Sequence, residues 1–353
     1  MSSADTAADK TPRRVPNGEW PLVTLAVLTY NQEQWVETAM AGAFAQDYPN
    51  LEIIVSDDCS EDDTFHRIQQ TARAYNGPHR VLVRQTEKNV GSLLHAAGVA
   101  TLARGELLVL AAGDDISKAN RVAVLLDAWK RTGAWGLCSR YDLIDESGIP
   151  LAMGEQAAVL RSHGFDRYFL ADCRSTQVVH GCTSAYDARL FGHLRLTPED
   201  YVLSEDGALS VLLNLLGKPI AHLEESLILY RQSSNSLTNS VRRLALTFPE
   251  IDRDEANILR FAQAQANRCR LFLRMDEDLR EDKVRRISRR GVEAELLMQE
   301  VKANWYVSWL GARALSIVQR SVPWRWALPR LFGRRLFYCL KWVASRRQWT
   351  NSG

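Results

Sequence analysis

The chain has 353 residues, of which 46% are hydrophobic, and a formal net charge of +2. Because single hydrophobic cores stop growing near ~250–300 residues, this length predicts one domain of ordinary size with an extension. The six cysteines lack the short spacings of a zinc site or a secreted disulfide framework, which indicates reduced thiols. The N-terminal residues lack the apolar core of a signal peptide, and no apolar run reaches the ~18 residues of a membrane-spanning helix, so we expect a cytoplasmic protein.

Basic residues are concentrated at the C-terminal end. From Val301 onward there are ten lysines and arginines and no acid. Taking these ten from the 44 basic residues of the chain leaves 34 against 42 acids, so residues 1–300 carry a formal charge of −8. An acidic body repels phosphate backbones, which argues against broad nucleic-acid binding by this part of the chain.

Strand-like and helical patterns alternate over the first part of the chain. Residues 1–20, with Pro12 and Pro16 and few apolar side chains, are predicted to be a disordered leader. After them, strands are expected at Leu22–Thr29, Leu51–Ser56, Arg80–Arg84, Leu107–Ala111 and Trp135–Ser139, and helices at Glu33–Gln46, Asp62–Tyr75, Ser92–Ala103 and Ala119–Arg131. Continuous apolar strands that alternate with helices indicate an α/β fold, a mostly parallel sheet with helices on both faces.

The second part of the chain shows shorter patterns. The region from Gly148 to Arg174 is irregular and is the expected place of an insertion. Strands are predicted at Gly181–Tyr186, Pro219–Leu223 and Leu227–Tyr230, and a helix at Glu205–Leu216. Between Asp254 and Val301 apolar residues recur at the spacing of an amphipathic helix that packs on one side, which predicts a helical extension.

Acidic residues follow two of the predicted strands directly. Asp57 and Asp58 come after the strand at 51–56, and Asp114 and Asp115 come after the strand at 107–111. Because the carboxyl ends of parallel strands form the ligand crevice of an open α/β sheet, both clusters should open onto one site. Carboxylates without cysteine or histidine partners suit Mg²⁺ or Mn²⁺, ions that usually bridge a diphosphate. The pattern therefore indicates an enzyme that handles a nucleotide-linked substrate.

Four segments, in this order, carry a family resemblance: Val23–Asn31, Gln46–Ser60, Asn89–Gly91 and Ala112–Asp115. They resemble the family 2 nucleotide-sugar glycosyltransferases of the GT-A fold. The resemblance implies a GT-A domain at residues 21–240, to which the patterns add a helical extension at 241–304 and a basic, tryptophan-rich amphipathic tail at 305–353.

The resemblance also implies a nucleotide-binding set: Thr29, Tyr30, Asn31, Glu33, Asp57, Asp58, Asn89 and Asp114. A carboxylate such as Asp57 can accept the N3–H of uracil, and Tyr30 can pack against the base. For Asn31 and Asp62, capping of the helices that follow them is an equally good interpretation. For Asp57 ligand binding is favoured, because Ser60 and Glu61 already offer local caps.

Asp114 matches the last carboxylate of the family's Asp-x-Asp signature and is the first candidate metal ligand. Ala112 replaces the earlier aspartate, although Mg²⁺ needs only one or two protein carboxylates beside the diphosphate. Asp115 either supports the cation or caps the helix expected near Ser117. A scheme without a cation, in which arginine or lysine neutralises the phosphate, is the alternative.

The segment Ser204–Gly207 resembles the family's Glu-Asp pair on the acceptor side, which makes Asp206 the expected catalytic base and Glu205 its orienting partner. The alternative is that both acids merely complement the dipole of the helix that starts there. Arg231 and Gln232 are weaker candidates for phosphate contacts, since the family's usual histidine near Ser233 is missing. His95 and His222 lie in helix and strand patterns and are expected to be packed or surface histidines rather than ligands.

The sequence therefore predicts an inverting glycosyltransferase that moves a sugar from a nucleotide-sugar, a UDP-sugar by preference, to a hydroxyl of a saccharide or lipid-linked saccharide in envelope polysaccharide synthesis. The irregular region at 148–174 would face this acceptor. Six tryptophans interleaved with arginines after residue 304 favour binding to an anionic membrane surface, and hence a peripheral location at the inner face of the cell membrane, over packing on the protein itself. A non-catalytic nucleotide-sugar-binding scaffold of an assembly complex is the alternative function. The donor sugar, the acceptor and the linkage are not predicted.

Overall fold

The computed structural model describes residues 20–151, 178–232, 248–279 and 289–303. The chain forms two compact units. The first contains the residues up to Gln232 together with Arg274–Ser288, and the second contains Ser233–Leu273 and Arg289–Gly353. The predicted leader, most of the irregular region at 148–174 and the tail at 305–353 lie outside the described residues.

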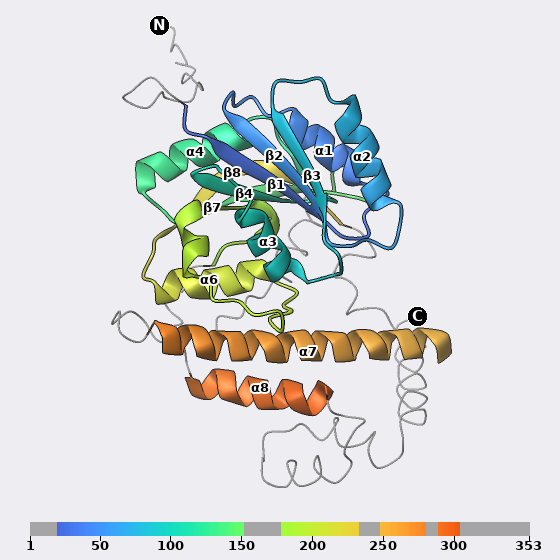
Figure 1. Ribbon diagram of the computed structural model, residues 1–353, viewed down its shortest axis with the longest axis vertical. Helices are drawn as coiled ribbons and strands as arrows, with labels where there is room; N and C mark the ends of the chain where they lie inside the picture. The colour runs from blue at the N-terminus through green and yellow to red at the C-terminus, as the bar shows by residue number, and fades with distance from the viewer. Residues whose placement is uncertain (1–19, 152–177, 233–247, 280–288, 304–353) are drawn as a thin grey trace, which may run out of the picture. The chain divides into compact units, whose positions relative to one another are not determined.

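An eight-stranded sheet forms the first unit, with the strand order β3-β2-β1-β4-β7-β6-β8-β5 (Figure 1). Four parallel strands form one half: β1 (Val23–Thr29), β2 (Leu51–Asp57), β3 (Arg80–Gln85) and β4 (Leu107–Ala112). The other half contains β7 (Ser184–Asp187), antiparallel to β4 and to β6 (Gly136–Ile144), then β8 (Ile220–Arg231), parallel to β6, and the short β5 (Ile116–Ser117). The predicted α/β fold with a mostly parallel sheet is confirmed.

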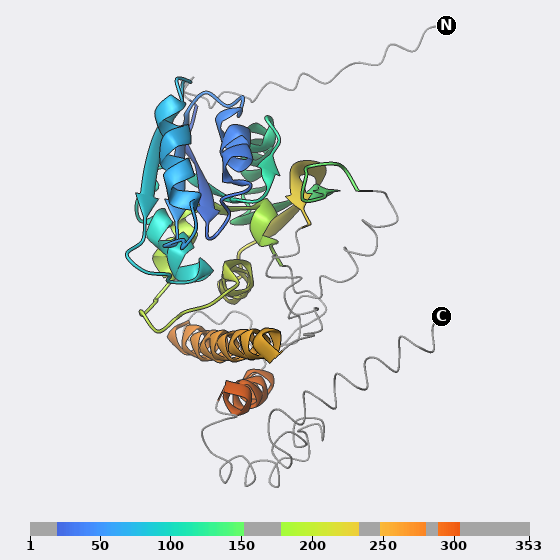
Figure 2. The same cartoon turned by 90° about the vertical axis from the view of Figure 1, so that its right-hand side faces the viewer.

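Helices cover both faces of this sheet (Figures 1 and 2). They are α1 (Val36–Phe44), α2 (Thr64–Ala74), α3 (Ser92–Ala100), α4 (Arg121–Thr132) and α6 (Glu205–Leu215), with 3-10 turns η2 (Gly181–Thr183) and η3 (Ala188–His193). Side chains of α1, α2 and α4 share one hydrophobic cluster with alternate residues of β1, β2 and β4. Apolar residues at positions 36, 39, 40 and 43 of α1 and at alternate positions of β1 explain this packing, since each set lies on one face of its element.

The direction of the chain across the sheet locates its ligand crevice. From β1 the chain moves outward to β2 and β3, and then returns to β4 on the other side of β1. The strand order thus reverses between β1 and β4, and the carboxyl ends of strands at such a reversal form the ligand crevice of open α/β sheets. The loops after β1, β2, β3 and β4 are therefore the expected site.

Several predicted elements differ from the structure. Pro219–Leu223 and Leu227–Tyr230 are one continuous strand, β8, because the polar residues between them stay extended. Shifts in the register between β6 and β8 accommodate the extra residues of β8. Gly181–Tyr186 begins as the 3-10 turn η2 before β7 starts at Ser184. The helix expected from Glu33 begins only at Val36, because the preceding residues bond to the loop after β2.

Two helices follow the last strand of the sheet, α7 (Phe248–Asp278) and α8 (Arg289–Ala303). α7 buries Ala262, Ala266 and Cys269 on the predicted face, which confirms a packed helix here. It also buries Ala264 and Leu271 on another face, so the prediction that it packs on one side only is wrong. The side chain of Arg270 on α7 pairs with Glu300 on α8 at 2.8 Å. No helix among the described residues is both long and apolar enough to cross a bilayer.

Candidate active site

The loops that leave β1 and β2 are joined by reciprocal hydrogen bonds. The Asn31 N–H donates to Ser60 Oγ at 2.8 Å, and Asn31 Oδ1 accepts from the Glu61 N–H at 2.9 Å. Glu33 Oε2 accepts from the Asp63 N–H at 3.0 Å. Asn31 has a φ of 52°, a left-handed conformation that asparagine tolerates better than most residues. These bonds place Asn31 and Glu33 beside the acidic loop after β2, as predicted for one site.

Asn31 and Asp62, the two predicted helix caps, differ in whether they cap the helix that follows them. α1 begins after Trp35 without a side-chain cap, so Asn31 does not cap it. Asp62 Oδ1 accepts from the backbone N–H of Thr64, the first residue of α2, at 3.0 Å, while Oδ2 accepts from the Glu33 N–H. Asp62 therefore serves the start of α2, as the local interpretation expected, and also connects the two loops.

Asp57 is fully buried at the end of β2 and accepts several hydrogen bonds from the protein. Its carboxylate accepts from Thr29 Oγ1 at 3.0 Å, from the Ser60 N–H at 2.8 Å and from Gln85 Nε2 at 2.9 Å, and also from the Ser60 hydroxyl. A nucleobase N–H would have to compete with these donors. Asp57 therefore fixes Thr29 and the turn at Ser60 relative to each other, whatever else it binds.

Asp58 anchors the loop after β3. It is 3% exposed, and it accepts from the N–H groups of Val90 and Gly91, both at 2.9 Å, and from Thr86 Oγ1 at 3.0 Å. This loop carries the half-buried Asn89, another member of the predicted nucleotide-binding set. The carboxylate of Asp58 thus determines where Asn89 lies.

Gly113 allows Asp114 to reach the β1 exit. A Cβ atom at Gly113 would collide with the Gln32 side chain and with Thr29 Cγ2, so a larger residue would push the β4 exit away from β1. Burial raises the pKa of Asp114, and Arg231 partly opposes this effect. Asp114 is half-buried, next to the predicted nucleotide-binding residues.

Asp115 lies deeper than Asp114, and one of its oxygens is unsatisfied. Oδ1 accepts from the Arg231 N–H at 2.9 Å, whereas Oδ2 is buried without a hydrogen-bond partner among the described residues. Burial, and then the charge of Asp114, raise the pKa of Asp115 well above its ordinary value. The predicted capping role is wrong: β5 follows Asp115 directly, and α4 begins only at Arg121 after Asn120.

The two carboxylates fit a divalent cation that is held jointly with a diphosphate. No group of three or more histidine, cysteine or acidic side chains within the described ranges could hold a metal by itself. Mg²⁺ needs only one or two protein carboxylates when phosphate and water complete its shell. The unpartnered Oδ2 of Asp115 is a buried acceptor with capacity for a cation or a proton. Asp114 and Asp115 are therefore the residues that would hold the ion.

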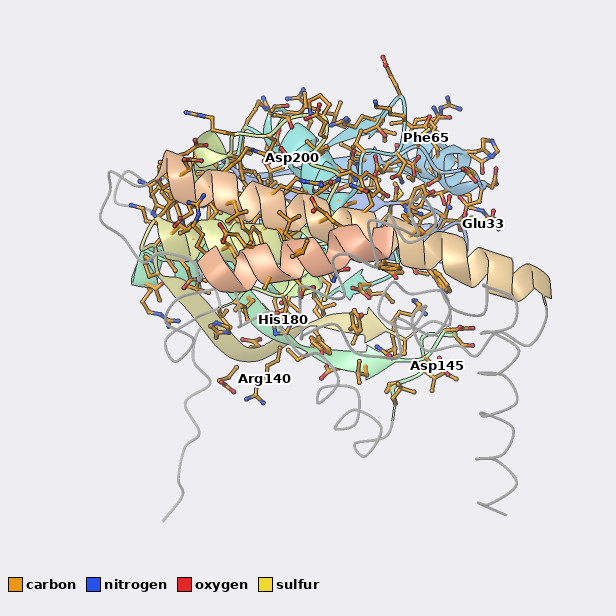
Figure 3. All side chains as sticks on the ribbon, turned by 90° about the horizontal axis from the view of Figure 1, so that it is seen from below. Glu33, Phe65, Arg140, Asp145, His180 and Asp200 are labelled. Atoms are coloured by element: carbon orange, nitrogen blue, oxygen red, sulfur yellow. The ribbon has the colours of Figure 1, made fainter. Side chains whose placement is uncertain are left out.

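Arg231 and Gln232 support the neighbouring backbone. The buried Arg231 guanidinium donates from Nε to Asp114 O at 2.9 Å and from NH1 to Asp145 O at 3.1 Å and Glu146 O at 2.8 Å. The Gln232 N–H donates to Ile144 O at 2.8 Å. Figure 3 shows Asp145 and Glu33 toward the same end of the sheet. These partners are backbone carbonyls, so Arg231 steadies Asp114 in addition to any contact with a phosphate.

Glu205 and Asp206 begin α6, capped by Ser204. Asp206 Oδ2 accepts from the Gly181 N–H at 3.0 Å, and Oδ1 accepts from the Gly207 N–H at 2.7 Å and from the Ser204 hydroxyl. Burial, and then the charge of Asp206, raise the pKa of Glu205 from 4.5 to about 7. A pair of carboxyl groups, one of which has a pKa of about 7, can exchange a proton near neutral pH. This property suits a role in proton transfer, which acids that merely complement the helix dipole do not need.

The start of α6 contacts the loop that Asp58 holds. Gly91 has a φ of 81°, and a Cβ atom on it would lie 3.1 Å from Val202 O and from the Tyr201 ring. The Glu205 N–H donates to Ser92 Oγ at 3.2 Å. The structure thus brings the start of α6, with Glu205 and the predicted catalytic base Asp206, into contact with the loop that carries part of the nucleotide-binding set.

The two histidines differ in their surroundings: His95 is buried, whereas His222 is exposed on β8. His95 is 3% exposed and lies 2.6 Å from Ser56 Oγ, and burial lowers its pKa to about 4. His222 Nδ1 lies 3.2 Å from Cys138 Sγ. Sequence analysis misses Gly181, whose N–H holds Asp206, and Arg121, which is fully buried beside Asp115. An arginine in the first turn of a helix opposes the helix dipole, and that signal could have identified Arg121.

An open α/β sheet with acidic loops at its reversal point and a carboxylate pair beside them is an arrangement of the GT-A fold, and solved structures share this fold. The fold is similar to that of Staphylococcus aureus TarS residues 1–349, crystallised with UDP-GlcNAc, with a TM-score of 0.50, 16% identity, and coverage of 88% of this chain and 78% of that one. It is also similar to the mannosyltransferase PcManGT of Pyrobaculum calidifontis, solved with GDP-Man and Mn²⁺, with a TM-score of 0.50, 16% identity, and coverage of 97% and 90%.

The family follows from the sequence comparison. Residues 24–195 match the model of glycosyl transferase family 2, which identifies this part of the chain as a glycosyltransferase domain of that family. WcaA of Escherichia coli K12, whose name assigns it provisionally to colanic acid biosynthesis as a glycosyl transferase, is 32% identical over 106 residues, 30% of this chain. The chain spans 37% of the length of WcaA and 27% of that of a Mycobacterium bovis relative.

Proposed function

We propose that the protein transfers a sugar, with inversion, from a nucleotide-sugar to a hydroxyl of a saccharide or lipid-linked saccharide during envelope polysaccharide synthesis. The contact between the loop that Asp58 holds and the start of α6 supports this proposal most directly: Ser92, next to the Gly91 that bonds to Asp58, accepts from the backbone N–H of Glu205. A donor bound at the β1–β4 exits would then present its sugar to the start of α6. The names of WcaA and of the Bacillus subtilis relative TuaG, assigned provisionally to teichuronic acid biosynthesis, favour a polysaccharide as product.

In this proposal different residues bind the nucleotide and accept the proton. Tyr30 packs on the nucleobase, and the loops held by Asp57 and Asp58 surround the base and ribose. Asp206 accepts the proton of the attacking hydroxyl, and Glu205 orients Asp206. Because the pKa of Glu205 is raised, the two carboxyl groups can share this proton. A UDP-sugar is the preferred donor, as in the TarS complex, although the PcManGT complex contains GDP-Man.

Asp114 and Asp115 would bind Mg²⁺ or Mn²⁺ together with the diphosphate, and the ion would neutralise the charge of the departing nucleoside diphosphate. Because Asp114 and Asp115 are the only carboxylates at the β4 exit among the described residues, we expect weak metal binding without nucleotide. Arg231 keeps Asp114 in place through its backbone carbonyl.

The basic, tryptophan-rich segment from Trp305 to Trp349, which lies outside the described residues, is proposed to bind anionic membranes and to keep the enzyme at the cytosolic face of the cell membrane. Co-sedimentation with phosphatidylserine vesicles at low salt tests this for the full chain and for a chain ending near Asn304. Pelleting of the full chain alone is expected. If both remain in the supernatant, the segment packs on protein instead.

A second candidate is a non-catalytic scaffold that binds nucleotide-sugar without turnover. Ala112 in place of an aspartate is the observation in its favour, since it removes one carboxylate from the cation site. Incubation of the pure protein with a panel of nucleotide-sugars and Mn²⁺ separates the two functions. The enzyme releases nucleoside diphosphate from at least one donor, whereas a scaffold binds donor and leaves it intact.

A further inference from the structure

Arg121 is fully buried at the first position of α4. The helix dipole opposes a cation in the first turn, and a buried guanidinium costs free energy unless acceptors surround it. Neither helix formation nor core packing therefore favours an arginine here. Because helical side chains point toward the N-terminus of their helix, Arg121 reaches back from α4 toward the β4 exit.

The guanidinium of Arg121 bonds to several separate segments. NH1 donates to Ser117 Oγ on β5 at 2.9 Å. NH2 donates to Leu110 O on β4 at 2.6 Å, to Cys182 O on η2 at 3.0 Å and, more weakly, to Ser184 O on β7 at 3.4 Å. The NH2 atom of Arg121 thus joins β4, which leads to Asp114, to the turn η2.

Each of the joined segments holds one part of the site. β4 continues through Ala112 and Gly113 into Asp114. In η2, the Gly181 N–H donates to Asp206 Oδ2 at 3.0 Å, and a Cβ atom at Gly181 would lie 2.6 Å from Glu205 Oε1. The turn therefore fits closely around both carboxylates of α6, and its place relative to β4 depends on Arg121.

We propose that Arg121 is a positioning residue that sets the place of Asp206 relative to Asp114. The guanidinium, bonded at once to Leu110 O and Cys182 O, fixes the turn that holds Asp206 against the strand that carries Asp114. It does so without touching a substrate, since its side chain has no exposed surface. The inference rests on the proposed function, in which Asp206 accepts the proton and Asp114 supports the leaving group.

A purely structural arginine would behave differently from a positioning one. Loss of a structural contact lowers stability and reduces turnover by the same factor whether or not Asp206 is present. Loss of positioning reduces turnover only while Asp206 is there to be positioned, so the two substitutions should not be additive. A double-mutant cycle of Arg121 and Asp206 separates these two possibilities.

The test uses Arg121→Lys, which keeps the charge but loses the planar fork that spans the two carbonyls. We expect kcat to fall about 10- to 100-fold, as for a misplaced catalytic group, with UDP affinity within about threefold of wild type. In the Asp206→Asn background the same substitution should cost less than about threefold. Arg131→Lys, an exposed change on the same helix, is the matched control and should leave both constants unchanged.

Ser117→Ala keeps Arg121 and removes the acceptor of its NH1. This variant replaces Arg121→Lys in the double-mutant cycle if Arg121→Lys does not fold. It should reduce kcat about two- to fivefold, again only when Asp206 is present. Equal losses in both backgrounds, or full turnover in every folded variant, would overturn the inference. If Asp206→Asn alone keeps normal turnover, the assigned base is wrong and the proposed function fails first, which distinguishes the two failures.

Discussion

The carboxylates at the β2 exit and those at the β4 exit and the start of α6 differ in how fully the protein satisfies them. Asp57 and Asp58 are buried, and each accepts hydrogen bonds from at least three other residues' side chains or N–H groups. Asp115 has an oxygen without a partner among the described residues, and burial raises the pKa of Asp114 and Glu205. Satisfied carboxylates hold loops in place, whereas those with raised pKa retain affinity for a cation or a proton. The first group should build the pocket and the second should act in it.

The largest effect is expected for Asp206→Asn. Removal of a general base lowers turnover about 10²–10⁴-fold and spares donor affinity. Steady-state kinetics with a verified acceptor and titration with UDP provide the two readouts. Near-normal transfer by the variant would place the base elsewhere, with Glu205 as the next candidate.

Asp57→Asn should reduce stability most, because Thr29, Ser60 and Gln85 lose a charged acceptor inside the protein. A loss of about 2–4 kcal/mol in the free energy of unfolding is expected. Urea denaturation measures it, with the exposed Asp63→Asn as control. UDP affinity should fall with or without Mn²⁺, since the loops around the base lose their anchor. Unchanged stability together with unchanged UDP affinity would remove Asp57 from the site.

Asp114→Ala should affect nucleotide binding through the cation alone. Calorimetric titration with UDP is expected to show an affinity gain with Mn²⁺ for the wild type, about tenfold or more, that the variant lacks, while affinity without metal stays the same. The equal loss of affinity in both conditions would show that Asp114 supports the loop rather than the ion. Manganese titration without UDP should give weak binding to both proteins.

Glu205→Gln should change the pH dependence of stability. The folded-state pKa of Glu205, about 7, lies above the unfolded value near 4.5, so the folded protein holds its proton more tightly. The stability that this proton contributes is present below pH 4.5 and is lost as the pH rises toward 7. Thermal unfolding should therefore show a decline across this window in the wild type that is smaller in the variant. Parallel curves would mean that Glu205 ionises normally.

Much of the donor half could be predicted from the sequence, because its signals are local. β1, β2 and β4 are largely apolar runs whose predicted bounds agree with the structure to within one residue, and polar residues at their ends mark the crevice. The helical extension followed from regular spacing in the same way. β8 could not be recognised as one strand, because its exposed Glu224 and Glu225 resemble a turn.

The roles within the site were harder to predict, because they depend on contacts between distant segments. Asp57 and Asp58 are adjacent in sequence, yet one bonds to the β1 side and the other to the loop after β3. Arg121 reaches Cys182, 61 positions along the chain. Sequence indicates that acids gather at the strand ends, but only the fold shows which of them the protein itself satisfies.

The configuration of the newly formed glycosidic bond tests the central claim most directly. The wild-type protein would be incubated with an active nucleotide-sugar, Mn²⁺ and acceptor, and proton NMR would follow the first product. A single displacement assisted by Asp206 predicts the anomer opposite to that of the donor, and product formation about 10²-fold or more slower with Asp206→Asn. Retention of the donor configuration, or tight donor binding without any product across the panel, would contradict it.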